Sequence, residues 1–185
     1  MAVEEAPGLN DLYEAVAAAA DSGRGPSPVQ LWSPANCGDI DIRIARDGSW
    51  FHQGSPIGRP ALVRLFSTVL RRDPDGFCLV TPAEKLRIAV EDAPFLAIGV
   101  ELAAGALRFA TNVGDVVEAG PEHPIRVALG EGGAPRPYLL VRGGLEALIA
   151  RPVFYELVAL AEEREGRLGV RSNGAWFDLG PLEGA

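Results

Sequence analysis

The polar side chains most capable of binding or catalysis occur singly along this chain of 185 residues. His52 lies in the segment "SWFHQGSPIG", and Arg59 follows directly after that segment. Asp92 lies in "VEDAPF", and Asn112 and Asp115 lie in "TNVGD". A few placed polar groups are what orient a small molecule in a mainly apolar pocket. His52, Arg59, Asp92, Asn112 and Asp115 are therefore our candidate ligand-binding residues.

Each candidate also has a purely structural interpretation. His52 can be an exposed or edge histidine, and a pocket role would require it to face inward beside an acid such as Asp41. Asp92, Asn112 and Asp115 stand where strands are expected to end, and Asp and Asn side chains at such places commonly bond nearby backbone groups in turns. Both interpretations stay open for all five residues.

No constellation in the sequence predicts catalysis or metal binding. Ser55 lies in a Gly/Pro turn with no base expected beside it, and no G-x-S-x-G motif occurs. Neither G-x-x-x-x-G-K-[ST] nor G-x-G-x-x-G occurs, so no motif predicts nucleotide binding. Cys37 and Cys78 are interpreted as separate thiols, and no zinc-ligand spacing exists. We expect no catalytic residue, no metal and no cofactor.

Four arginines surround a predicted helix that begins at Pro60. Arg59, Arg64, Arg71 and Arg72 could attract an anion or an acidic partner, with Arg64 and Arg71 on one helical face. The alternative is a solvated polar face, which is the common role of charges on an amphipathic helix.

Composition and charge narrow the classes of partner. Apolar residues make up 48% of the chain, which is typical of a globular protein. The net charge of −8 disfavours nucleic-acid binding, because it repels phosphate backbones. No apolar run approaches the length of a membrane span, and the N-terminal residues lack a signal-peptide pattern. We expect no nucleic acid, no membrane and a cytoplasmic location.

The periodicities predict an α+β protein. Helices are expected over residues 9–20, from Pro60 to Leu70 and over residues 151–165, with a short helical turn at 143–150. The alternation in "IDIRIA" and the following "RDGS" predict a β-hairpin that returns through "WFHQ". Short strands separated by turn residues between 77 and 142 predict an antiparallel meander or β-roll.

An echo between the chain ends predicts an internal repeat. "ARDGSWFHQG" resembles "VRSNGAWFDLG", and the helix at Leu12–Ala20 resembles the one at Phe154–Glu162. We therefore expect helix–β-hairpin units at both ends, packed with a central antiparallel β-roll. The predicted parts are an N-terminal helix and tail (1–24), an α/β roll (25–92) and a β-roll with the C-terminal repeat (93–185).

Several longer blocks carry a family resemblance. "DGSWFHQGSPIGR", "LVTPAEK", "VEDAPF" and "TNVGD" resemble a bacterial family known as domain-of-unknown-function family 1285. The resemblance runs from about Trp32 to the C-terminus. It implies a two-part α+β arrangement and a suggested role in ligand binding linked to signalling. It implies no catalytic residue.

We therefore predict a non-enzymatic module that binds a small polar ligand, in signal transduction, with the ligand between the repeat hairpins and the central β-roll. The first alternative is a structural or interaction adaptor that forms a homo-oligomer such as a homodimer. The second is an enzyme of unknown reaction, which would need a titratable pair in a cleft.

Overall fold

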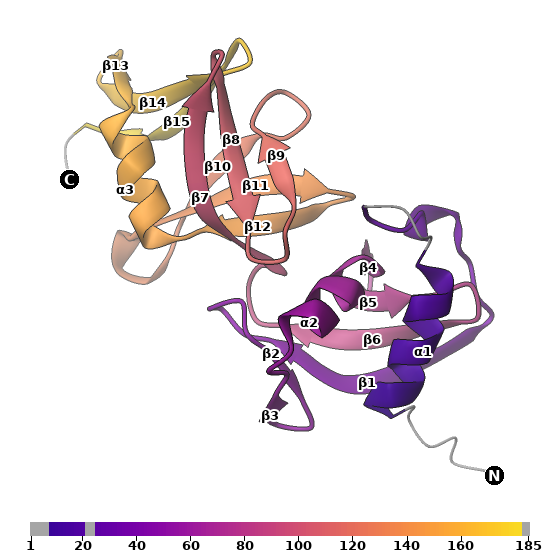
Figure 1. Cartoon of the computed structure of the whole chain (residues 1–185). Coiled ribbons are helices and arrows are strands. Elements are labelled where there is room, and N and C mark those ends of the chain that lie inside the picture. Colours follow the sequence, from indigo (N-terminus) through magenta and orange to yellow (C-terminus); the bar gives the residue numbers. More distant parts are fainter. Residues whose placement is uncertain (1–7, 21–24, 183–185) are drawn as a thin grey trace. The chain divides into compact units, whose positions relative to one another are not determined.

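The computed structural model describes residues 8–20 and 25–182 (Figure 1). It divides the chain into two compact units, Met1–Asp92 and Ala93–Ala185, called here the N-terminal and C-terminal units. Strands dominate both units, and three α-helices accompany them in the described residues. The predicted α+β class is therefore confirmed.

The N-terminal unit is one six-stranded sheet with two helices (Figure 1). The sheet order is β3-β2-β1-β6-β5-β4, with β1 and β6 parallel at its centre. Its elements are α1 (Leu9–Ala19), the short 3-10 helix η1 (Val29–Leu31), β1 (Asn36–Ile44), β2 (Trp50–His52), β3 (Ser55–Pro56), α2 (Pro60–Ser67), β4 (Leu70–Asp73), β5 (Gly76–Val80) and β6 (Glu84–Val90).

The C-terminal unit contains a six-stranded and a three-stranded sheet (Figure 1). The larger sheet has the order β10-β11-β12-β7-β8-β9, and β13-β14-β15 form the smaller one. Its elements are β7 (Phe95–Ala103), β8 (Ala106–Thr111), β9 (Val116–Glu118), β10 (Ile125–Leu129), η2 (Glu131–Gly133), β11 (Pro135–Arg142), β12 (Leu145–Ile149), α3 (Arg151–Ala159), β13 (Glu162–Arg164), β14 (Arg167–Ser172) and β15 (Ala175–Pro181).

The two large sheets have the same topology. Adding six to each strand number of β3-β2-β1-β6-β5-β4 gives the second sheet, read from its other edge. Each sheet consists of two three-stranded antiparallel meanders, joined by a parallel pairing of their first and last strands. The expectation of a purely antiparallel roll was therefore wrong at this central pair. Local alternation predicts strands but not which distant strands meet.

The repeat predicted from the two similar hairpins is not confirmed. Trp50 is buried, and its neighbour Phe51 is half-buried under Arg43. In the second hairpin Phe177 is buried, whereas Trp176 is half-buried. Since side chains alternate across a sheet, the two aromatic pairs face opposite ways.

The turns of these hairpins differ as well. Residues 45–49 connect β1 to β2, with the Ala45 N–H donating to the Ser49 carbonyl over 2.9 Å. In contrast, a two-residue turn of Asn173 and Gly174 connects β14 to β15. The first hairpin belongs to a six-stranded sheet and the second to the three-stranded sheet. The shared letters reflect common hairpin chemistry rather than an equivalent unit.

Helix α2 is shorter than predicted. It buries Leu62 and Phe66, and the Phe66 ring lies 6.5 Å from that of Trp50 between centroids. The helix ends at Ser67, and the residues after it form strand β4. Ser67 donates its hydroxyl to the Arg64 carbonyl over 2.7 Å, a local bond that competes with helix continuation.

The helical predictions near the C-terminus also need correction. A helical turn was predicted over residues 143–150, but Leu145–Ile149 is strand β12 in the large sheet. Helix α3 ends at Ala159, and Glu162–Arg164 pairs with β14 as strand β13. Charged residues that look helical by propensity are held in a strand there, because tertiary pairing overrides propensity.

Candidate functional site

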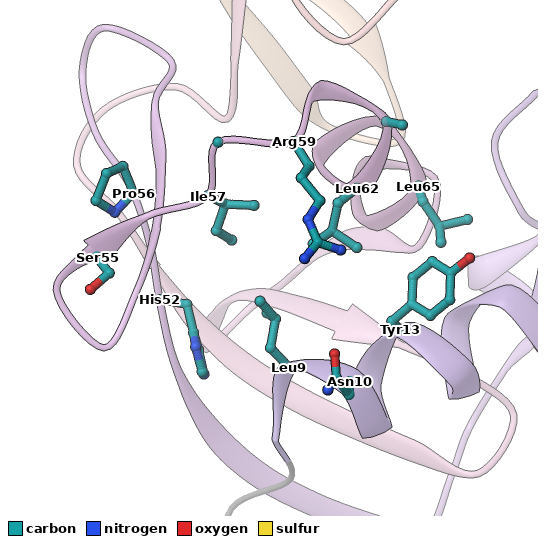
Figure 2. A pocket seen from close by; sticks show the side chains of 12 residues that line it. Leu9, Asn10, Tyr13, His52, Ser55, Pro56, Ile57, Arg59, Leu62 and Leu65 are labelled. Carbon is teal, nitrogen blue, oxygen red and sulfur yellow. The ribbon is translucent and has the colours of Figure 1, made fainter.

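The N-terminal unit contains a cleft of about 770 Å³ between α1, α2 and the β2–β3 hairpin (Figure 2). This volume is within the range of small-molecule sites. Helix α1 contributes Leu9, Asn10 and Tyr13; the hairpin and the loop after it contribute His52, Ser55, Pro56, Ile57, Gly58 and Arg59; and α2 contributes Ala61, Leu62 and Leu65.

The floor of the cleft is apolar. Leu62 is buried, and Leu9, Ile57 and Leu65 are half-buried around it. Leu9 lies on α1 and Leu65 lies on α2, which packs against α1, and Ile57 lies in the loop before α2. Covering such a surface with an apolar group of a ligand favours binding by about 25 cal/mol per Å² of apolar surface buried.

Polar residues also line the cleft. The Arg59 side chain extends from the loop before α2 into the cleft that Leu62 and Tyr13 also line (Figure 2). His52 and Ser55 lie at the hairpin end. Of the described residues that line the cleft, none is an aspartate or a glutamate.

His52 and Ser55 are directly paired across β2 and β3. The turn between them consists of Gln53 (φ 49°) and Gly54 (φ 76°). Two consecutive positive φ values are typical of a type I′ hairpin turn. The sequence interpretation that no base lies beside Ser55 was therefore wrong, because "HQGS" is itself a tight hairpin. Within the described residues, no hydrogen bond joins the two side chains, and no acid of the cleft supports the imidazole.

Two family models cover most of the chain. The N-terminal domain model of the domain of unknown function DUF1285 matches residues 27–93, and the C-terminal domain model of the same family matches residues 94–179. The chain belongs to the DUF1285 family. The resemblance seen in the sequence is thereby confirmed.

Solved structures of DUF1285 proteins agree with this assignment. A DUF1285 family protein from Silicibacter pomeroyi DSS-3 is 50% identical, with a TM-score of 0.89 over 97% of this chain and 98% of that one. A second, from Shewanella baltica OS155, is 28% identical, with a TM-score of 0.53 over 64% of this chain and 90% of that one. No curated protein matches the chain.

The DUF1285 models cover only part of the cleft. His52, Arg59 and the rest of the hairpin and α2 walls lie inside the N-terminal model, which begins at residue 27. Helix α1 precedes that residue, so Leu9, Asn10 and Tyr13 come from outside the matched region. One wall of the cleft is therefore supplied by sequence that the family models do not describe.

The other three predicted site residues do not line this cleft. Asp92 ends the N-terminal unit, and Asn112 and Asp115 belong to the C-terminal one. Asn112 accepts a hydrogen bond from the Leu96 N–H with its side-chain oxygen (3.0 Å) and donates its own N–H to the Leu96 carbonyl (2.9 Å). These bonds hold the turn after β8 against β7.

Asp115 has a structural partner as well. Its carboxylate lies 3.4 Å from the Arg142 guanidinium, and its backbone N–H donates to the Thr111 hydroxyl over 3.0 Å. Arg142 also stacks over the Phe95 ring at 4.8 Å. Burial lowers the pKa of Arg142, and the nearby Asp115 charge opposes that shift. These contacts of Asn112 and Asp115 are the ones that the turn interpretation predicts.

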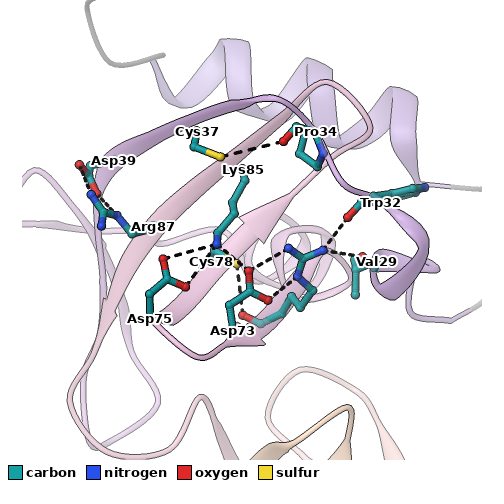
Figure 3. A network of polar contacts seen from close by, with 11 residues as sticks. Val29, Trp32, Pro34, Cys37, Asp39, Asp73, Asp75, Cys78, Lys85 and Arg87 are labelled. Atoms are coloured by element: carbon teal, nitrogen blue, oxygen red, sulfur yellow. Dashed lines mark hydrogen bonds and ion pairs between the residues drawn. The ribbon is translucent and has the colours of Figure 1, made fainter.

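The predicted arginine cluster does not form around the helix. Arg71 and Arg72 lie on strand β4 rather than on α2. Arg71 makes a two-pronged ion pair with Asp73 (2.7 and 2.8 Å) and donates to the carbonyls of Val29 and Trp32 (2.9 and 2.7 Å; Figure 3). Arg71 therefore ties the η1 segment to the sheet and is not available for an anion.

Lys85 completes this network from strand β6. Its ammonium lies 2.6 Å from Asp73 and 3.3 Å from Asp75 (Figure 3). The hydrogen bond from Arg71, with help from Lys85 and despite partial burial, lowers the pKa of Asp73 to about 2. Mainly because of burial, the pKa of the nearby Cys78 thiol is raised to about 11. The network is a structural clamp rather than a reactive centre.

Two general expectations concern metals and membranes. The described residues contain no group of three or more His, Cys, Asp or Glu side chains placed to hold a metal ion. None of the helices in this part of the chain has the length and apolar character needed to span a membrane.

The cleft residues that sequence reasoning missed are mainly apolar. Leu9 and Leu65 look like ordinary core positions of amphipathic helices, and Tyr13 looks like a position at the edge of one. The one available signal was Ile57 in "GSPIGR", an apolar residue isolated in a loop directly before Arg59. Only the packing of α1 on α2 shows that these side chains share one space.

Proposed function

We propose that the N-terminal unit is a non-enzymatic module that binds a small polar ligand in the cleft between α1, α2 and the β2–β3 hairpin. The observation that carries this proposal is the cleft itself, which combines an apolar floor at Leu62 with the polar lining residues His52 and Arg59. This combination is typical of small-molecule sites. The signalling role suggested by the family resemblance would follow from ligand binding, and it stays a prediction.

Chemical features of the cleft favour binding over catalysis. Ser55 and His52 are paired, but no carboxylate of the described cleft residues orients the imidazole as a general base. The thiols lie elsewhere, since neither Cys37 nor Cys78 lines the cleft. The arrangement can hold a molecule and bond its polar atoms, without an evident activated nucleophile.

A screen with a blocked cleft tests the proposal. Ala61 lies exposed on α2 and lines the cleft, so Ala61→Trp should fill it. Ala18→Trp is the matched control, because Ala18 is an exposed helical alanine on α1 that does not line the cleft. Metabolites that raise the melting temperature of the wild-type chain and of Ala18→Trp, but not of Ala61→Trp, support the proposal. Stabilisation that survives in Ala61→Trp, or a screen without hits, contradicts it.

A second candidate function is an adaptor that associates with a second copy. On the large sheet of the C-terminal unit, Ile98 is 55% and Val116 is 64% exposed. Ala110 on the strand between them is also exposed, and it pairs with Gly99 on one side and with Val116 on the other. Exposed apolar residues grouped in this way are typical of interaction surfaces. If they form a homo-oligomer interface, Val116→Glu should shift the sedimentation coefficient to that of the monomer, whereas Glu118→Gln should not. A wild-type chain that sediments as a monomer contradicts this candidate.

A further inference from the structure

We infer that the ligand of the cleft is an organic anion, a carboxylate or phosphate attached to a compact apolar body, and that Arg59 binds its charge. This inference rests on the proposed binding function of the cleft and adds the chemical class of the ligand.

The charges within the cleft support an anion. Arg59 is the only residue with a permanent charge among the described residues that line it. A cationic ligand would meet Arg59 and no carboxylate there, so both its repulsion and its lack of a counter-charge disfavour it. An anion would instead gain a charge-assisted hydrogen bond from the guanidinium.

Arg59 differs from three other arginines of the same unit, whose side chains are paired. Arg43, Arg71 and Arg87 form ion pairs with Glu91, Asp73 and Asp39. The backbone carbonyl of Arg59 accepts from the N–H groups of Leu62 and Val63, but its guanidinium makes no hydrogen bond or ion pair to another described residue. A guanidinium presents a planar fork of donors that fits a carboxylate or a phosphate. The donors of Arg59 are therefore free to meet an incoming anion.

The remaining lining residues define the rest of the ligand. Leu9, Ile57, Leu62 and Leu65 provide an apolar surface for a short aliphatic chain or an aromatic ring. The hydroxyl of Ser55 and the imidazole of His52 can bond further oxygen atoms near the hairpin. Since the whole chain carries a net charge of −8, long-range attraction of anions is weak. Recognition must then come from short-range contacts in the cleft.

Four small probes of similar size separate the charge classes. Benzoate, phenyl phosphate, benzamide and benzylamine are titrated into the ¹⁵N-labelled full chain, and the amide signals of Gly58 and Ala61 report on the cleft. We expect benzoate or phenyl phosphate to bind at least about tenfold more tightly than benzamide or benzylamine. The stronger of the two anions identifies a carboxylate or a phosphate as the preferred group.

Two matched variants test whether Arg59 binds the anionic group of the probe. Arg59→Gln should weaken anion binding about 10- to 100-fold, the effect of losing a hydrogen bond to a charged group, and leave benzamide binding unchanged. Arg64→Gln, within α2 and outside the cleft, should change neither by more than about twofold. An unchanged amide spectrum away from the cleft shows that both variants are folded.

Other outcomes overturn the inference in distinguishable ways. If benzamide binds as tightly as benzoate, or if Arg59→Gln binds anions as the wild-type chain does, the anion class is wrong while the cleft remains a binding site. If no probe shifts the cleft signals, the anion inference falls as well, and the screen against Ala61→Trp decides the proposed function separately.

Discussion

His52 and Ser55 face each other across the two-residue turn of Gln53 and Gly54, and both line the cleft of the N-terminal unit. The turn therefore sets the position of two polar groups at one end of the proposed site. The loop that follows it leads directly to Ile57 and Arg59. The β2–β3 hairpin and the loop after it thus supply both polar and apolar residues to one wall of the cleft.

This turn should be sensitive to substitution at Gly54. Its φ of 76° lies in the left-handed region, and a Cβ there would meet no neighbour within 4 Å, so only backbone strain opposes a side chain. We expect Gly54→Ala to lower the free energy of unfolding by about 1 kcal/mol. Gln53→Asn should raise the free energy of unfolding by roughly a few tenths of a kcal/mol, because asparagine tolerates positive φ better. Urea unfolding measures both changes, and a Gly54→Ala chain as stable as the wild type would rule out the type I′ turn.

The lowered pKa of Asp73 predicts that the folded chain loses stability in acid. Its folded-state pKa of about 2 lies below the ordinary value of 3.8, so between these values the folded chain binds fewer protons than the unfolded chain. The stabilisation is complete above about pH 5, is lost as the pH falls toward 2, and amounts to about 2 kcal/mol. Between pH 6 and 3, the wild-type chain should lose about 1 kcal/mol more than Asp73→Asn.

Urea titrations at the two pH values, followed on amide signals of the N-terminal unit, measure this difference. Asp75→Asn serves as the control, since the Asp75 side chain is 50% exposed and meets Lys85 at the longer distance of 3.3 Å. The control should keep the wild-type profile. Equal acid sensitivity of the wild-type chain and Asp73→Asn would show that the clamp contributes no such linkage.

The two cysteines should react at very different rates. Cys78 is buried, and its pKa is raised to about 11, whereas Cys37 is exposed. Because the thiolate is the reactive form, iodoacetamide at pH 8 should modify Cys37 and spare Cys78 in the native chain. Peptide mapping by mass spectrometry gives both extents of labelling. Native Cys37→Ser should then remain unlabelled until urea is added, and rapid native labelling of Cys78 would contradict its burial.

A close packing contact in the small sheet should make Gly169 irreplaceable. A Cβ at this position would lie 2.3 Å from Cζ2 of Trp176 and 2.7 Å from the Phe177 carbonyl oxygen. Gly169→Ala should therefore destabilise the C-terminal unit by about 1–3 kcal/mol. Gly99→Ala is the control, because a Cβ there meets nothing within 4 Å, and its effect should stay within about 0.5 kcal/mol. Thermal unfolding that does not distinguish the two variants would refute the contact.

Features encoded in neighbouring residues could be predicted from the sequence. The alternation of Ile40, Ile42 and Ile44 indicates strand β1, and all three side chains are buried. The spacing of Leu62 and Phe66 indicates the buried face of α2. In both cases one face of one element determines the pattern, so the signal is local.

Features that depend on distant partners could not be predicted in this way. The parallel pairing of Ile44 with Val90 joins strands separated by most of the N-terminal unit. Arg71 looked like a helical surface residue, and only the end of α2 at Ser67 and the pairing with β5 place it beside Asp73. No local pattern contains this information.

The candidate site follows the same division. His52 and Arg59 were recognised by their chemistry, and the structure places both in one cleft. Asn112 and Asp115 were recognised by the same criterion, but their contacts fix turns of the C-terminal unit. Residue type alone therefore did not separate binding groups from turn-forming groups.

The most direct test of the ligand-binding cleft is a crystal structure of the full chain soaked with a compound that stabilises it in the thermal screen. We predict density for the compound against Leu62, with its polar group at the Arg59 guanidinium and no density at that place in crystals of Ala61→Trp. Density for the compound at a different surface, with the cleft unchanged, would contradict the account.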